Sequence, residues 1–107
     1  MTTFDEREKG EERKFAMDEE NLFKARARRD RLVAQWAGDK LGLKGAEIET
    51  YAKGLLGTDI EKHGDTAVIA KLKLDLAAKS ISISDQQIEL VLREKMIQAQ
   101  EEIKQGR

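Results

Sequence analysis

The sequence predicts an all-α protein, a four-helix bundle preceded by a charged N-terminal arm that is mobile or weakly helical. Proline is absent from the 107 residues, and the commonest residues are good helix formers, so only glycine interrupts helices. Apolar side chains recur at helical spacing in four separate segments. Leu, Ile, Val and Phe together supply 25 residues, and 20 basic residues nearly balance 21 acidic ones, which is typical of one folded domain.

The first predicted helix spans about residues 18–41 and ends before Gly42, which is suited to a helix C-cap. Its apolar residues fall within one arc at about 100° per residue. They are Leu22, Ala25, Leu32, Val33 and Trp36. The second predicted helix, about residues 46–61, has an apolar stripe of its own. That stripe consists of Ile48, Tyr51, Ala52, Leu55, Leu56 and Ile60.

The third and fourth predicted helices span about residues 65–79 and 85–105. Asp65 is the expected N-cap of the third, whose apolar stripe is Val68, Ile69, Leu72 and Leu76. Ser84 and Gln87 form a capping box at the start of the fourth, with Ile83 and Ile88 placed as a hydrophobic staple. The alternating residues 80–84 lack a partner strand, so we expect an extended linker. The short connections favour antiparallel neighbours within one bundle, residues 18–107.

Residues 1–17 form the arm, because the first twenty residues hold only Phe4 and Phe15 of the core-forming residues. Those twenty residues carry eight acids and four bases, whereas residues 21–40 carry six bases and two acids. The opposite charges predict an attraction between arm and bundle that salt would screen. Thr3 and Glu6 form another capping box, but Gly10 and the shortage of apolar residues weaken a helix. We expect the arm to become helical against a partner.

Arg29 stands near the centre of the apolar arc of the first helix, where an unpaired charge would be expensive. Asp75 occupies the equivalent place on the third helix. We therefore predict a structural ion pair between Arg29 and Asp75. The alternative, given equal weight, is that the Arg29 side chain extends along the apolar surface and reaches water.

Several function classes find no support in the sequence. It has no Cys, His63 is the only His, and no P-loop or calcium-binding loop is present, so we expect no metal, no cofactor and no enzymatic activity. No apolar run approaches the ~20 residues of a membrane span, and the N-terminus is too polar for a signal peptide, so we expect a cytoplasmic protein without membrane insertion. The basic cluster points in several directions on a helix, which argues against nucleic-acid binding. Its members are Arg26, Arg28, Arg29 and Arg31.

Leu90 and Ile97 lie about opposite Ile88 and Leu92 on the fourth predicted helix, so this helix is apolar on two sides. Isolated surface residues or a helix sandwiched within the bundle is the favoured interpretation. The alternative is a partner-binding surface.

Several segments of the chain together carry a resemblance to a known family. They are Phe4-Asp5-Glu6-Arg7-Glu8-Lys9, Lys14-Phe15-Ala16, Asp18-Glu19-Glu20, Phe23-Lys24-Ala25, Ala27-Arg28-Arg29, Leu32, Trp36, Leu41-Gly42, Tyr51-Ala52 and Gly64-Asp65. These residues resemble the alphaproteobacterial zeta subunit, the inhibitor of the rotary F-type ATP synthase, a family long filed as a domain of unknown function. The resemblance covers nearly the whole chain. In the family an aromatic residue often follows the glycine of the arm, whereas here Glu11 follows Gly10.

The resemblance implies a regulatory inhibitor of ATP hydrolysis by the F1 sector, whose arm enters an alpha/beta catalytic interface beside the rotor. It assigns partner binding to Phe4, Asp5, Glu6, Arg7, Glu8, Lys9, Lys14 and Phe15. The implied partners are the alpha, beta and gamma subunits. We expect a free monomer that associates peripherally with the inner-membrane ATP synthase. The alternative is a structural or adaptor bundle that binds another protein or a small ligand.

Overall fold

The structure is a computed structural model that describes residues 19–62 and 64–106. These residues form four α-helices and no strand, which confirms the all-α four-helix fold. The helices are α2 (Glu19–Leu41), α3 (Ala46–Lys62), α4 (Asp65–Ala77) and α5 (Asp85–Lys104). Each bound lies within two residues of the predicted one. The predicted arm lies outside the described residues.

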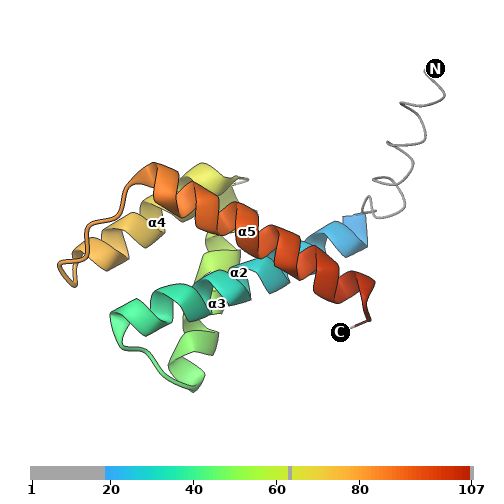
Figure 1. Cartoon of the computed structure of the whole chain (residues 1–107), viewed down its shortest axis with the longest axis horizontal. Helices are drawn as coiled ribbons and strands as arrows, with labels where there is room; N and C mark the ends of the chain where they lie inside the picture. Colours follow the sequence, from blue (N-terminus) through green and yellow to red (C-terminus); the bar gives the residue numbers. More distant parts are fainter. Residues whose placement is uncertain (1–18, 63, 107) are drawn as a thin grey trace, which may run out of the picture.

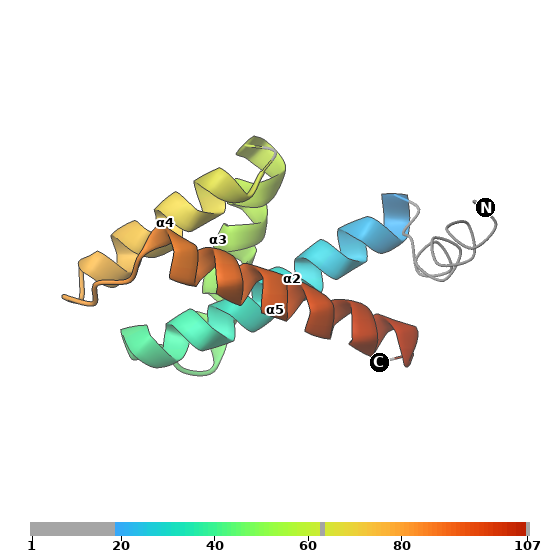
Figure 2. The ribbon, with the colours of Figure 1, turned by 45° about the horizontal axis from the view of Figure 1, so that its top comes forward.

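The other three helices pack around α2, which is the longest helix. Figures 1 and 2 show α5 crossing α2 near the middle of both helices, and α3 crossing α2 from its other side. Helix α4 and the first half of α5 run in roughly opposite directions at an oblique angle to each other, and residues 78–84 connect them. The expectation of antiparallel neighbours therefore holds only approximately for α4 and α5, and α3 runs steeply across α2.

Small residues on α2 allow this close crossing. The second half of α2 buries Ala34, Ala37 and Gly38. A Cβ atom added at Gly38 would lie 3.0 Å from Cγ1 of Ile48 on α3, so the two helices come close together at this point. The predicted apolar arc of α2 is therefore partly wrong: Leu22 is 42% exposed and Trp36 only half-buried, and small side chains form the contact face.

The hydrophobic core lies where α2, α3, α4 and α5 meet. The buried residues of its largest cluster are Val33, Ala34, Ala37, Ala52, Leu55, Val68, Ile69, Leu72, Ile88 and Leu92. The residues that α3 and α4 contribute to this cluster all belong to their predicted apolar stripes. Ile60, at the end of the α3 stripe, is 50% exposed and was wrongly placed in the core.

The helix ends follow local sequence chemistry. The capping box of α5 is confirmed, because the Gln87 backbone N–H donates to Ser84 Oγ at 3.1 Å and the Ser84 N–H donates to Gln87 Oε1 at 3.0 Å. Gly42 adopts a φ of 80° after α2, as expected of a C-cap glycine. Residues 81–84 form neither helix nor strand, so the predicted linker is confirmed.

The end of α4 has a less expected feature. Ser80 adopts a left-handed φ of 64°, and its N–H donates to the Ala77 carbonyl at 2.8 Å. The Ile81 N–H donates to the Leu76 carbonyl at 2.9 Å. These two hydrogen bonds make a Schellman motif in which Ser80 takes the place usually held by glycine.

Candidate functional site

The predicted partner-binding residues, from Phe4 to Phe15, lie outside the described residues. The structure describes the surface from which the arm begins, the first turns of α2 from Glu19 onward. Figures 1 and 2 show that the start of α2 and the end of α5 lie at the same end of the bundle, opposite the connection between α4 and α5. The surface of this end is therefore built from residues far apart in the sequence.

A groove of about 880 Å³ lies between the first half of α2 and the end of α5. Phe23, Ala27, Leu32 and Ile103 supply its apolar lining. Arg28 reaches across it, with Nη1 lying 3.0 Å from Glu102 Oε1 of α5. This ion pair connects the helix that carries the arm to the C-terminal helix.

A second depression, about 350 Å³, lies on the other side of Phe23, where α2 meets the end of α3. Phe23 and Ile60 line it and are 51% and 50% exposed, and nearby in the sequence Leu22 is 42% exposed. This exposed apolar surface was not predicted from the sequence. The signal available for Phe23 was its place outside the apolar arc of α2, about 80° beyond Val33 at 100° per residue.

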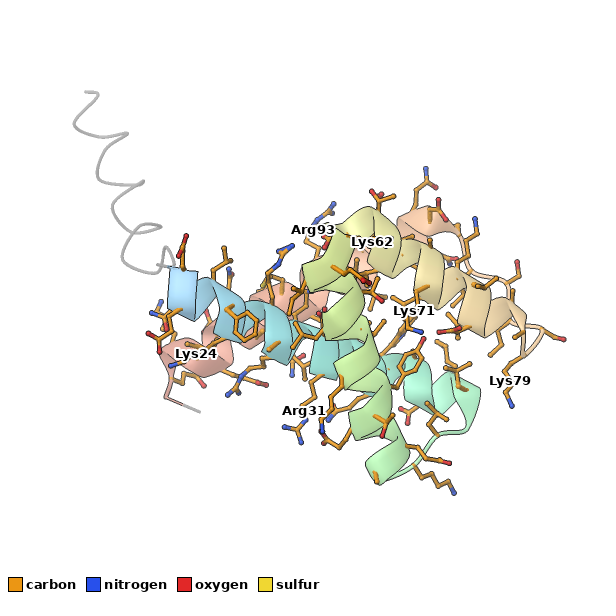
Figure 3. All side chains as sticks on the ribbon, turned by 180° about the vertical axis from the view of Figure 1, so that it is seen from behind. Lys24, Arg31, Lys62, Lys71, Lys79 and Arg93 are labelled. Carbon is orange, nitrogen blue, oxygen red and sulfur yellow. The ribbon has the colours of Figure 1, made fainter. Side chains whose placement is uncertain are left out.

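The basic residues do not gather on one face. Figure 3 shows Lys24, Arg31, Lys62, Lys71, Lys79 and Arg93 spread over several helices. Arg31 Nη2 lies 2.6 Å from Glu49 Oε2 of α3, and Lys24 Nζ lies 3.4 Å from Glu20 Oε2. The arginines of the predicted basic cluster thus point to different helices, as expected.

A buried ionic cluster holds the first half of α2 against α3 and α4. Its members are Arg26, Arg29 and Asp30 of α2, Asp59 of α3 and Asp65 of α4. The side chains of Arg29, Asp30 and Asp59 are at most 2% exposed. Of these charged residues, only Arg29 was predicted from the sequence to be buried.

Arg29 is the centre of this ionic cluster. Its Nη2 atom lies 2.9 Å from Asp30 Oδ1 and 3.2 Å from Asp59 Oδ2, and its Nη1 lies 2.9 Å from Asp65 Oδ1. One guanidinium therefore binds carboxylates from three helices. The multiple partners compensate the cost of burying its charge.

The predicted pair of Arg29 with Asp75 is wrong. Asp75 Oδ2 instead accepts a hydrogen bond from the Tyr51 hydroxyl at 2.7 Å and one from Lys71 Nζ at 3.2 Å. Asp65 and Asp75 stand ten residues apart on α4, or about 15 Å along a helix, and only Asp65 lies beside Arg29. The alternative in which Arg29 reaches water is also wrong, because its side chain is 2% exposed.

Asp65 also differs from its predicted role as an N-cap. It is the first residue of α4, and Gly64 takes the N-cap position without a side-chain hydrogen bond. The Asp65 carboxylate binds Arg29 instead of the backbone of its own helix. The tertiary ion pair therefore replaces local capping.

Burial and neighbouring charges shift the pKa values of the ionic cluster. Burial raises the pKa of Asp30 to about 6; Arg29 opposes this shift, and the nearby Asp59 carboxyl adds to it. Burial would lower the pKa of Arg29, but Asp30 and Asp65 outweigh that effect and raise it. Outside the cluster, burial and the hydrogen bond to Asp75 raise the pKa of Tyr51.

Leu90 and Ile97 of α5 are 49% and 58% exposed, and Leu74 of α4 is 72% exposed. Of the favoured interpretation, the part in which α5 is sandwiched within the bundle is therefore wrong for these two positions. Isolated surface residues, and the alternative of a partner-binding surface, remain. Among the residues described, no group of three or more acidic or His side chains could hold a metal ion.

No helix formed by residues 19–62 or 64–106 is long and apolar enough to cross a membrane.

Comparison with known families gives one result that covers almost the whole chain. A family model described as ATPase inhibitor subunit zeta matches residues 1–102, which include the predicted arm and all four helices except the last two residues of α5. The comparisons with curated proteins and with solved structures returned no match. The match over nearly the full length agrees with the resemblance carried by the arm and α2. The chain belongs to the ATPase inhibitor subunit zeta family.

Proposed function

We propose that the chain inhibits ATP hydrolysis by the F1 sector of F-type ATP synthase, with residues 1–17 entering an alpha/beta catalytic interface near the gamma subunit. The observation that carries this proposal is the family match, which begins at residue 1 and so includes the arm. The chain acts as a regulator and not as an enzyme. It works in the cytoplasm and meets the membrane only through the ATP synthase.

The division of labour between arm and bundle supports this mechanism. Among the residues that the structure describes, the core is assembled from α2 to α5, and we expect these helices to fold without the arm. The arm carries many charges and only two large apolar residues, Phe4 and Phe15. A segment of this composition gains its order from a partner, by pairing its charges and burying its few aromatic side chains.

The surface around the first turns of α2 is suited to stay at the mouth of the catalytic interface while the arm is inside. Leu22 and Phe23 are exposed there and can add apolar contact area. The Arg28–Glu102 pair ties α2 to α5, which gives the arm a rigid base. A rigid base converts binding of the arm into a block of rotation.

The alternative is an adaptor bundle that binds another protein or a small ligand. The exposed Leu74 and Ile97 side chains are the observation in its favour. In that case the four helices alone would carry the binding activity, and the arm would be dispensable. Deletion of residues 1–17 therefore separates the two functions.

The test measures ATP hydrolysis by purified F1 from the source organism with full-length protein, with protein lacking residues 1–17, and with no addition. We expect inhibition by the full-length protein only, while the circular dichroism and thermal unfolding of the shortened protein remain those of a folded bundle. A double variant, Phe4→Ala with Phe15→Ala, should weaken inhibition because it removes both aromatic anchors.

Leu74→Ala is the matched control, because it removes an exposed apolar side chain from α4 and leaves the arm intact. It should inhibit like the unmodified protein. Full-length protein that leaves hydrolysis unchanged would contradict the proposal and favour the adaptor function. Inhibition that survives deletion of the arm would place the inhibitory surface on the bundle.

A further inference from the structure

The buried ionic cluster contains a carboxyl group with an unused oxygen. Asp30 Oδ1 accepts a hydrogen bond from Arg29 Nε at 3.0 Å and lies 2.9 Å from Arg29 Nη2. Asp30 Oδ2 is buried and has no hydrogen-bond partner. A buried, ionised carboxylate oxygen without a donor is costly, so the second oxygen of Asp30 needs an explanation.

The neighbouring carboxylate of Asp59 does not have this problem. Its Oδ1 atom accepts a hydrogen bond from Arg26 Nη2 at 3.3 Å, and its Oδ2 atom accepts one from Arg29 Nη2 at 3.2 Å. Both oxygens of Asp59 are thus bound by guanidinium groups. Of the two buried carboxyl groups, Asp30 is therefore the one with an oxygen free to hold a proton.

The charge of the cluster leads to the same residue. Two arginines and three aspartates give a net charge of −1 when all are ionised. One proton on Asp30 makes the cluster neutral. Among residues 19–62 and 64–106, Glu89 and Arg93 of α5 also face it, since they line a cavity together with Arg26, Arg29 and Asp65. This pair is itself neutral in sum.

We propose that the ionic cluster is a proton-operated clasp, in which a proton on Asp30 Oδ2 tightens the end of α3 and the start of α4 against the first half of α2. Loss of that proton leaves one excess negative charge in a cluster whose side chains come from three helices. The contacts that then weaken are those of Asp59 and Asp65, which connect α3 and α4 to Arg29. The cluster therefore holds the half of α2 that directly follows residues 1–18 in the sequence.

The direction of the pH effect follows from the raised pKa of Asp30. An acid whose pKa is higher in the folded chain stabilises the fold when protonated, and this contribution is lost as pH rises through the folded-state pKa. With the pKa of Asp30 raised from 3.8 to about 6 by burial, the change falls between about pH 4 and pH 7. The clasp is therefore tighter in mildly acidic solution.

The first test is an NMR titration of the side-chain carboxyl carbon of Asp30 in the full chain. We expect a midpoint between about pH 5 and pH 7, well above the ordinary value of about 4 for an aspartate. A midpoint below about pH 4.5 would overturn the proposal. This measurement uses the unmodified protein and so does not depend on any variant folding.

The second test is amide hydrogen exchange in the last turn of α3 and the second turn of α4, where the N–H groups donate within their helices, corrected for the intrinsic pH dependence of exchange. Protection in the unmodified protein should fall by about tenfold between pH 5 and pH 8. Asp30→Asn, which is always neutral, should remove most of that fall. Asp39→Asn, a change at an exposed position of the same helix, should retain it. Equal pH dependence in the unmodified protein and Asp30→Asn would overturn the clasp.

Discussion

The two halves of α2 contact their neighbours by different means. Its first half presents buried charges, with Arg29 and Asp30 held to Asp59 and Asp65. Its second half presents small apolar residues, among them Ala37 and Gly38. Buried charges demand specific partners, whereas small residues permit close approach without dictating polar geometry. The first half therefore contains the residues whose replacement should cost most.

Arg29→Ala should have the largest effect on stability, because it leaves Asp30 and Asp59 buried without their shared counter-charge. We expect a loss of about 3–5 kcal/mol in the free energy of unfolding, measured by urea denaturation at pH 7.5. Arg31→Ala is the control, since the exposed pair with Glu49 should contribute less than about 1 kcal/mol. A loss for Arg29→Ala no larger than that of the control would contradict the contrast between the two halves.

The contact between Tyr51 and Asp75 tests the partner assignment directly. A double-mutant cycle of Tyr51→Phe with Asp75→Ala should give a coupling energy of about 1–3 kcal/mol, because the hydroxyl donates to a carboxylate. The cycle of Arg29→Ala with Asp75→Ala should give less than about 0.5 kcal/mol, because the two residues share no partner. A larger second value would revive the predicted Arg29–Asp75 pair.

Glycine-to-alanine substitutions probe the close crossing in the second half of α2. Gly57→Ala on α3 should stabilise the protein by about 1 kcal/mol, since nothing lies near the added methyl group. Gly38→Ala should lose most of that gain, because its methyl group would crowd Ile48. Thermal unfolding of both variants measures the difference, and equal stabilisation would mean that the crossing tolerates more bulk than the structure indicates.

Ser80 follows α4 and belongs to neither half of α2. The substitution Ser80→Gly therefore measures the cost of local backbone strain alone, for comparison with the changes on α2. The left-handed φ of 64° is unfavourable for serine and easy for glycine. We expect a gain in the free energy of unfolding of at most about 1 kcal/mol, measured by urea denaturation. Ser82→Gly in the adjoining linker is the control; an equal gain there would point to a general effect of flexibility.

Local signals in the sequence were sufficient for the four helices and for two of their ends, the end of α2 and the start of α5, but not for the start of α4. The capping box of Ser84 and Gln87 lies within four consecutive residues, so it forms whatever the rest of the chain does. The same holds for Gly42 after α2. Periodicity also identified most of the core of α3 and α4. The roles of the candidate inhibitory residues, which lie within residues 1–18, remain predictions from composition and family resemblance.

The partners of the buried charges could not be predicted in the same way. Periodicity places Arg29 on the inner face of α2, but its partner depends on how far each helix extends past the crossing point. That distance is set by tertiary contacts such as Gly38 with Ile48, which no pattern within one helix reveals. The burial of Asp59 was missed for a related reason, because an aspartate in an amphipathic helix is normally solvent-exposed.

The common location of the first turn of α2 and the last turn of α5 has a practical consequence for labelled proteins (Figures 1 and 2). A bulky affinity tag or fluorescent protein fused after Arg107 would be held near the base of the arm. Such a fusion would obstruct a large partner that engages the arm, whereas a small dye at the same place would report its arrival. A label on the connection between α4 and α5, at the opposite end, would leave that approach open.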